Sequence, residues 1–133
     1  MTAAHADEPD AAGSDVVVAM VNEERDSAGC SPVTVDDRLS SAAQDHSQDQ
    51  ADRGVMTHTG SDGSTSGERA TRAGYRWSKI AENVASGTTS AERAMDMWME
   101  SSGHRENVLN CAYRHIGVAE VGGYWTQIFG RPR

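Results

Sequence analysis

The 133-residue sequence contains a single lysine, Lys79, and no long uninterrupted hydrophobic run. Its 20 acidic and 12 Lys and Arg side chains give a formal net charge of −8. A field of that sign repels nucleic acid phosphates and anionic lipid headgroups, so neither is expected as a partner. No apolar run approaches the ~20 residues that cross a bilayer. We therefore expect a protein that neither binds nucleic acid nor spans a membrane.

The first residues lack the apolar region of a signal peptide. Ala4-His5-Ala6, followed by Asp7, nevertheless resembles the small-residue end of a cleavage site. Two interpretations stay open, the end of a signal region or a disordered acidic leader. We expect a flexible acidic leader over residues 1–14 and one domain over residues 15–133, since single domains commonly hold about 100–200 residues.

The two cysteines, Cys30 and Cys111, lie far apart in the sequence. Their spacing fits neither a C-x-x-C redox pair nor a cysteine-based metal site. They form either one long-range disulfide or two buried thiols, and the residues alone leave both open. In the chain-entropy model a bridge of this span would stabilise the fold by about 4 kcal/mol. It would also indicate a compartment outside the cytoplasm.

Helical patterns fill the first half of the chain. Apolar spacing predicts a helix from Asp15 to about Gly29, and a second helix from an N-cap at Thr34 to about Gly54. Residues 57–67 are rich in Gly, Ser and Thr and predict a loop.

The second half mixes helices and strands. A short helix is expected over residues 68–75, and "KIAENVAS" predicts a strand. Thr89 and Glu92 form a capping box for a further helix, and "RENVLNC" predicts additional helical turns. Apolar and polar residues alternate within "HIGVAEV" and within "YWTQIF". Gly122-Gly123 joins these two runs and is a hairpin signal. This order of elements predicts a layered α+β domain.

Residues able to move protons or bind metal are scattered along the chain. His46 continues the apolar face of its helix and is interpreted as a core histidine, whereas His58 lies in a polar loop. Glu82 interrupts an apolar run, where a buried carboxylate needs a partner such as an imidazole. His104 follows a glycine at a predicted helix start, where the helix dipole disfavours its charged form.

Recognisable catalytic motifs are missing. The sequence has no H-E-x-x-H zinc motif and no G-x-S-x-G nucleophile elbow. Ser101 and Ser102 are interpreted as helix caps. The stripe of Arg69, Arg72 and Arg76 is interpreted as a solvated, salt-bridged face.

Seven segments occur in one order with short spacings and together resemble the CAP superfamily, in its short bacterial branch of SCP-like extracellular proteins. The resemblance covers roughly residues 17–130 and rests on the segments "VNEERDSAGCSPVTVDDRLSSAAQDHS", "MTHTGSDG", "RAGYRW", "AENVASG", "MWMESSGHRENVLNC", "IGVAEV" and "YWTQIFG". It implies a secreted α+β protein, a three-layer α-β-α sandwich with a small, mostly antiparallel central sheet. It also implies a disulfide between Cys30 and Cys111.

The resemblance further implies a cleft lined by histidines and acids, where longer members place two His and two Glu and some bind zinc or another divalent ion. His58 matches the loop histidine of the family. Glu82 matches the acid of the family's "G-E-N" motif, although Ala81 replaces its glycine. The family's second acid falls at Glu100 or Ser101 in this sequence. Tyr124 stands where "H-Y-T-Q" has its histidine, and His104 of "G-H-R" offers another imidazole. The expected cleft therefore contains His58, Glu82, Glu100, His104, Tyr124 and Gln127.

A phenol is a poor zinc ligand at neutral pH, so the expected metal set is reduced to His58, Glu82 and His104. We expect no required cofactor and only weak binding of zinc or another divalent cation.

Three functions follow from this reading. The first is a secreted, monomeric binding module whose partner is a small molecule, a lipid or a cell-wall component. The second is a metal-assisted or His/Glu hydrolase, with His58, Glu82 and His104 as candidate catalytic residues. The third is a structural or interaction domain whose polar cluster locks the core.

Overall fold

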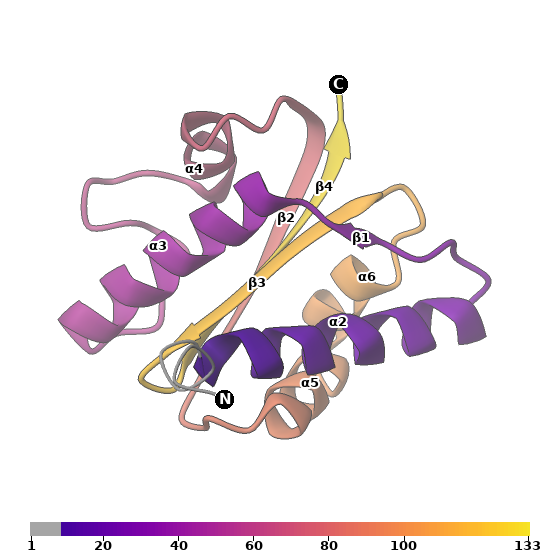
Figure 1. Cartoon of the computed structure of the whole chain (residues 1–133), viewed down its shortest axis with the longest axis horizontal. Coiled ribbons are helices and arrows are strands. Elements are labelled where there is room, and N and C mark those ends of the chain that lie inside the picture. Colours follow the sequence, from indigo (N-terminus) through magenta and orange to yellow (C-terminus); the bar gives the residue numbers. More distant parts are fainter. Residues whose placement is uncertain (1–8) are drawn as a thin grey trace, which may run out of the picture.

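The computed structural model describes residues 9–133 and builds helices and one sheet from them (Figure 1). None of the described helices is both long and apolar enough to cross a bilayer. The elements follow in the order α2 (Pro9–Ser27), β1 (Thr34–Val35), α3 (Asp37–Arg53), α4 (Ser66–Arg72), β2 (Trp77–Ser86), α5 (Ala91–Met99), α6 (Ser102–Val108), β3 (His115–Val121) and β4 (Tyr124–Pro132).

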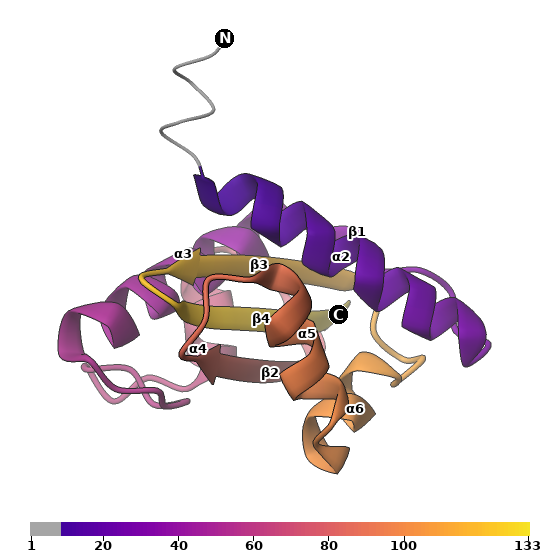
Figure 2. The same ribbon diagram turned by 90° about the horizontal axis from the view of Figure 1, so that it is seen from below.

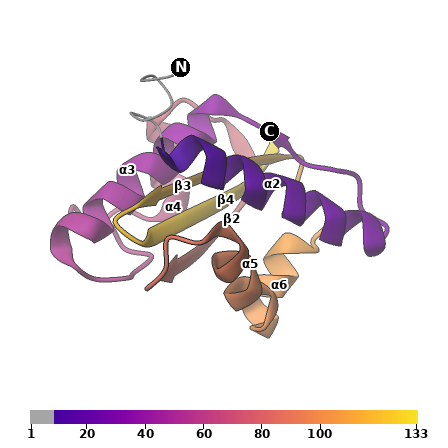
Figure 3. The same cartoon turned by 60° about the horizontal axis from the view of Figure 1, so that its bottom comes forward.

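The four strands form one sheet in the order β1-β3-β4-β2. β1 pairs with β3 in parallel, whereas the β3–β4 and β2–β4 pairs are antiparallel. Helices α3 and α4 lie on one face of the sheet, and α2, α5 and α6 lie on the other (Figures 2 and 3). The expected α+β three-layer sandwich is confirmed. β2 is an edge strand, and within residues 9–133 no strand pairs with its outer side.

Several helix starts differ from the sequence expectations. Thr34 is not an N-cap, because it pairs with His115 in the short parallel strand β1. Asp36 caps α3 instead, and its side chain accepts a hydrogen bond from the Arg38 N–H. The pairing of β1 with β3 extends the backbone at Thr34 and so moves the helix start to Asp37.

The helix α5 is capped by Ser90, whose hydroxyl accepts from the Arg93 N–H, rather than by Thr89. The first helix α2 begins at Pro9, ahead of the expected start at Asp15. The leader expected over residues 1–14 falls in part on residues 1–8, which lie outside the described residues.

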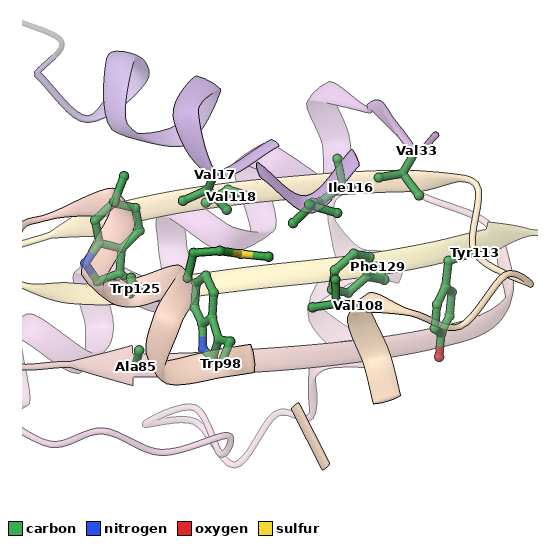
Figure 4. Packing of buried hydrophobic residues seen from close by; sticks show 14 residues of the cluster. Val17, Val33, Ala85, Trp98, Val108, Tyr113, Ile116, Val118, Trp125 and Phe129 are labelled. Carbon is green, nitrogen blue, oxygen red and sulfur yellow. The ribbon is translucent and has the colours of Figure 1, made fainter. Parts of the chain in front are cut away.

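The face of the sheet under α2, α5 and α6 carries an apolar core. Trp98 and Trp125 meet edge to face at 6.5 Å between ring centroids, and Val17, Ile116 and Phe129 are fully buried nearby (Figure 4). The Trp98 indole N–H also donates to the Val84 carbonyl at 3.1 Å, which ties α5 to β2. Burial of these side chains supplies the main driving force for folding of this layer.

The opposite face is different, because polar side chains reach into it. Ser47 Oγ and Thr126 Oγ1 lie 2.8 Å apart, and Gln50 Nε2 donates to the same Thr126 oxygen at 3.2 Å. All three residues are fully buried. Helix α3 approaches β3 so closely that a Cβ at Gly117 would lie 2.2 Å from the backbone carbon of Leu39. Only glycine at position 117 permits this docking, which buries a face of α3 that carries both apolar residues, such as Leu39 and Ala43, and polar ones, such as Ser47.

Cys30 and Cys111 form the expected disulfide, which links residues 81 positions apart. The bridge joins the end of the α2 segment to the loop after α6. Beside it, the fully buried Arg25 guanidinium donates to the carbonyls of Val108 and Tyr113, among others. A covalent tie and a buried cation therefore fix the same loop.

Candidate functional site

Glu82 is the centre of the candidate site. Its strand partner in β4, Ile128, belongs to the apolar cluster beneath α3, so Glu82 faces the same side of the sheet. The carboxylate is buried, with 2% of its side chain exposed. A buried carboxylate is costly unless charged or hydrogen-bonding partners surround it. Both of its oxygens have such partners.

His58 is the first partner, as the sequence predicted. Its Nδ1 lies 2.9 Å from Glu82 Oε1, and 59% of its side chain is exposed. The hydrogen bond to Glu82 raises the pKa of His58 and outweighs the opposing effect of partial burial. The Glu82 contact therefore favours the imidazolium form and orients the ring, which the surface still presents to solvent.

Arg69 is the second partner, and the sequence did not identify it. Its Nη2 donates to Glu82 Oε2 at 2.9 Å and to the His58 carbonyl at 2.9 Å, while Nη1 donates to the Ser64 carbonyl at 2.7 Å. The interpretation of Arg69 as part of a solvated stripe is wrong, because only 7% of its side chain is exposed. The sequence signal that could have identified Arg69 was Glu82, because a buried carboxylate needs a nearby cation.

Arg72, in contrast, fits the expected salt-bridged surface, since its exposed guanidinium pairs with Asp62 at 2.9 Å. The difference arises because α4 packs against β2, which turns Arg69 inward and leaves Arg72 at the surface.

His46 lies behind the Glu82 pair, fully buried on α3. Its Nε2 donates to the Thr57 carbonyl at 2.6 Å and lies 4.0 Å from Glu82 Oε1. Burial is the main cause of its lowered pKa, although the Glu82 charge opposes it. Burial therefore favours the neutral imidazole, whose hydrogen bond to the Thr57 carbonyl joins α3 to the following loop. It holds the loop that carries His58.

The His58 loop is held at a second point, where the Thr57 N–H donates to Gln50 Oε1 at 3.0 Å. Two side chains of α3 thus fix the residue directly before His58. The loop is consequently a positioned segment rather than a loose connection.

His104 lies on the other side of β2. Asn83, which follows Glu82 and points to the opposite face, donates to the His104 carbonyl at 3.1 Å and to Gln127 Oε1 at 2.9 Å. Asn107 of α6 donates in turn to Asn83 Oδ1 at 2.9 Å. Asn83 and Asn107 were missed in the sequence, and together they attach α6 to the sheet.

The His104 pKa is lowered, first by burial and then by the charge of His58. Four buried side-chain atoms have no hydrogen-bond partner among the described residues: His46 Nδ1, Arg69 Nε, His104 Nδ1 and Gln127 Nε2. Unsatisfied polar atoms are uncommon in protein interiors, and an ordered water commonly supplies the missing partner.

Glu100 and Tyr124 stand apart from this cluster. Glu100 is exposed at the C-cap of α5. Tyr124 is half-buried and pairs with Ser86, four residues beyond Glu82 on β2, or about 13 Å along the strand. Tyr124 shares the sheet face of Glu82, whereas Gln127 is fully buried on the opposite face.

The donor set does not fit a resident metal ion. Arg69 already supplies a positive charge to one Glu82 oxygen, and His58 occupies the other. Within residues 9–133, no group of three or more His, Cys, Asp or Glu side chains gathers with a geometry able to hold a metal. A cation at Glu82 would have to displace a guanidinium.

With this geometry in view, comparison with known proteins places the chain in the cysteine-rich secretory protein family, CAP. The family model matches residues 18–129, so the chain belongs to that family. A protein of Bacillus subtilis (strain 168), the uncharacterized protein YkwD, is 36% identical over 115 residues, which are 85% of this chain and 45% of YkwD. The uncharacterized membrane protein YlbC of the same strain is 26% identical over 113 residues, 85% of this chain and 33% of YlbC. The chain thus spans less than half of these relatives.

Solved structures show the same fold. An extracellular protein with an SCP domain from Bacillus anthracis superposes with a TM-score of 0.91 at 24% identity, over 98% of this chain and 44% of that chain. An outer surface protein of Borrelia burgdorferi superposes with a TM-score of 0.81 at 21% identity, over 90% of this chain and 92% of that chain. At these identities the likeness concerns the fold alone.

Proposed function

We propose that this CAP domain is an extracellular binding module that presents His58 to a small polar or anionic group of its ligand. The observation that carries the proposal is the hydrogen-bonded chain from Arg69 through Glu82 to His58. Its inner members are buried and its outer member is more than half exposed. Such an arrangement fixes a donor at the surface without requiring any chemical step.

Two further observations support this assignment. Val55 and Met56, three and two positions before His58, have exposed apolar side chains. A ligand with a polar head and an apolar part would therefore find contacts for both parts. The disulfide between Cys30 and Cys111 is typical of proteins outside the cytoplasm, which supports secretion. Lipids and cell-wall components are therefore the first ligands to test.

The test is a ligand screen against wild type and His58→Ala. Binding is followed by thermal shift and by the NMR signal of the His58 ring, with a panel of phospholipids, fatty acids, sterols and cell-wall fragments. Gln44→Ala, a change at an exposed residue of α3, is the matched control. A ligand that binds wild type and the control equally, but loses affinity with His58→Ala, supports the proposal. Ligands unaffected by His58→Ala would refute this site.

A hydrolase is the second candidate, favoured by one feature of the same site. Glu82 contacts His58 through Nδ1, and an imidazole oriented in this way offers Nε2 as a general base. Against it, the hydrogen bond raises the His58 pKa, which favours the protonated form that cannot accept a proton. Ester and amide substrates tested with wild type and Glu82→Gln distinguish the two functions. Turnover lost in a folded Glu82→Gln protein would favour the hydrolase.

For metal, we propose that zinc is neither required nor tightly held, because Arg69 competes for the same carboxylate. Calorimetry of zinc into chelator-treated protein tests this. Micromolar or tighter binding that is lost with His58→Ala would contradict it.

A further inference from the structure

A second surface, separate from the Glu82 site, surrounds Trp77 at the start of the edge strand β2. One open hollow of about 750 Å³ lies between α4 and β2 and is lined by Thr71, Trp77 and Ile80 among others. A neighbouring hollow of about 490 Å³ is lined by Arg76, Ser78 and Arg133, together with Thr71 and Trp77. Both volumes match small-ligand sites, roughly 300–1,000 Å³. Trp77 and Thr71 belong to both, so they form the shared wall.

The Trp77 ring is held in place by the structure. Its indole N–H donates to the Gly67 carbonyl at 3.1 Å and to Thr71 Oγ1 at 3.0 Å. A Cβ at position 67 would lie 2.6 Å from the ring, so glycine at this position lets the indole lie against α4. The ring is only half-buried. A fixed, partly exposed indole is a preorganised platform on which a flat apolar surface can stack.

Positive charge is concentrated beside this ring, in contrast to the acidic chain as a whole. Arg76 and Arg133 both line the smaller hollow, and the Arg133 N–H donates to the Arg76 carbonyl at 3.1 Å. Lys79 and Arg131 face the other side of the sheet, where Lys79 lies 5.8 Å from the Tyr113 ring centroid and Arg131 donates to the Ala112 carbonyl. The larger hollow also contains Arg72, which Asp62 neutralises, and Glu68, which is engaged in the α4 capping box. The smaller hollow, with Arg76 and Arg133, is therefore the anion-attracting part.

Hydroxyl groups complete the lining. Thr65 and Thr71 accept hydrogen bonds from the Glu68 N–H and the Trp77 indole, which leaves their O–H groups available to donate. The β-bulge at Ser78 interrupts the register between Trp77 and Lys79, and bulges at an edge disfavour the addition of a further strand. The surface is thus poorly suited to an extended peptide and better suited to a hydroxyl-rich ligand.

We propose that the Trp77 hollows bind an anionic saccharide. A sugar ring stacks on Trp77 in the larger hollow, and its carboxylate or phosphate is bound by Arg76 and Arg133 in the smaller one. Arginine forms paired hydrogen bonds with both anions, which suits this role. The surface lies outside the His58 site, so it adds a second ligand contact to the domain.

The test is calorimetry at low salt with trigalacturonic acid as probe, alongside the Trp77 indole N–H signal in NMR. Maltotriose is the uncharged control and triglutamate is the peptide control. We expect trigalacturonic acid to bind and to shift the Trp77 signal, and the affinity to fall about tenfold for each of Arg76→Gln and Arg133→Gln. Arg93→Gln and Arg105→Gln remove the same charge from exposed sites on α5 and α6 and should leave binding unchanged.

Trp77→Phe provides a second variant, because it keeps an aromatic ring but lacks the indole N–H that fixes it. Weaker binding in a protein with unchanged circular dichroism supports the need for an indole fixed by its N–H. Equal binding of triglutamate would show a general anion or peptide site and overturn the saccharide assignment. No binding of trigalacturonic acid at millimolar concentration would overturn the proposal, as would binding unaffected by the Arg76 and Arg133 variants.

Discussion

The two faces of the central sheet use different interactions. Under α2, α5 and α6, the buried side chains are chiefly apolar and include the Trp98–Trp125 pair. Under α3 and α4, buried polar groups lie among the apolar ones, with Glu82, Arg69 and His46 at the edge. Apolar burial is non-directional, so it stabilises the layer without orienting a particular atom. Hydrogen bonds are directional, and they orient the His58 ring.

The two faces of the sheet therefore have different roles. We expect a loss of volume on the apolar face to lower stability without changing the charge state of His58. The polar face determines that charge state and contributes to stability only while its partners stay paired. Substitutions confined to one face test this difference.

The largest effect is expected for Trp98→Ala. The change removes a fully buried indole and its hydrogen bond to the Val84 carbonyl. We expect a loss of about 5 kcal/mol, the upper end for a buried aromatic truncation, with no change in the His58 pKa of the remaining folded protein. Urea denaturation and histidine NMR measure the two quantities. A shifted His58 pKa would show that the faces are coupled.

The next effect is expected for Arg69→Met. The change leaves the buried Glu82 carboxylate without its cation, and breaking a buried pair commonly costs about 3–5 kcal/mol. The double variant Arg69→Met/Glu82→Leu removes both charges and should recover most of that stability. A double-mutant cycle by urea denaturation measures the coupling. If the double variant were no more stable than Arg69→Met, the uncompensated charge would not be the cause.

A smaller effect is expected for the double change Cys30→Ser and Cys111→Ser. Loss of this long-range bridge should cost about 2–4 kcal/mol. The bridge lies beside Arg25 and the loop after α6, away from Glu82, so the His58 pKa should stay constant. Thermal melts of oxidised wild type and the variant measure the cost. Equal melting temperatures would show that the buried Arg25 alone fixes this loop.

The smallest effect concerns pH. The folded-state pKa of His58 is raised, so its contribution to stability is fully present below the unfolded value, about 6.5, and is lost as pH rises through the folded pKa. The pKa of His46 is lowered, so the opposite holds, and stability is lost as pH falls below the unfolded value.

NMR titration should therefore find His58 above about 6.5 and His46 below it. Glu82→Gln should lower the His58 pKa, because the Glu82 hydrogen bond is its largest cause. An unchanged His58 pKa in Glu82→Gln would contradict the contact on which the site is built.

Part of the site was accessible from the sequence. The position of Glu82 within an apolar run predicted a buried carboxylate with an imidazole partner, and the His58 contact agrees with it. Arg69 was assigned to the surface, because helical spacing shows which residues share a face but not which neighbour covers that face. The relation of His104 to the site stays a prediction in part, since its backbone joins the Asn83 network on the other face of β2.

The sequence by itself determined the layered α+β class, the β3–β4 hairpin at Gly122-Gly123 and the segments typical of the CAP family, because periodicity and turn chemistry are local. Only the tertiary structure decided which cation neutralises Glu82, which residue caps α3, and how Arg76 and Arg133 meet beside Trp77. These depend on contacts between segments distant in the sequence. Their energies arise only when the sheet brings those segments within a few ångströms.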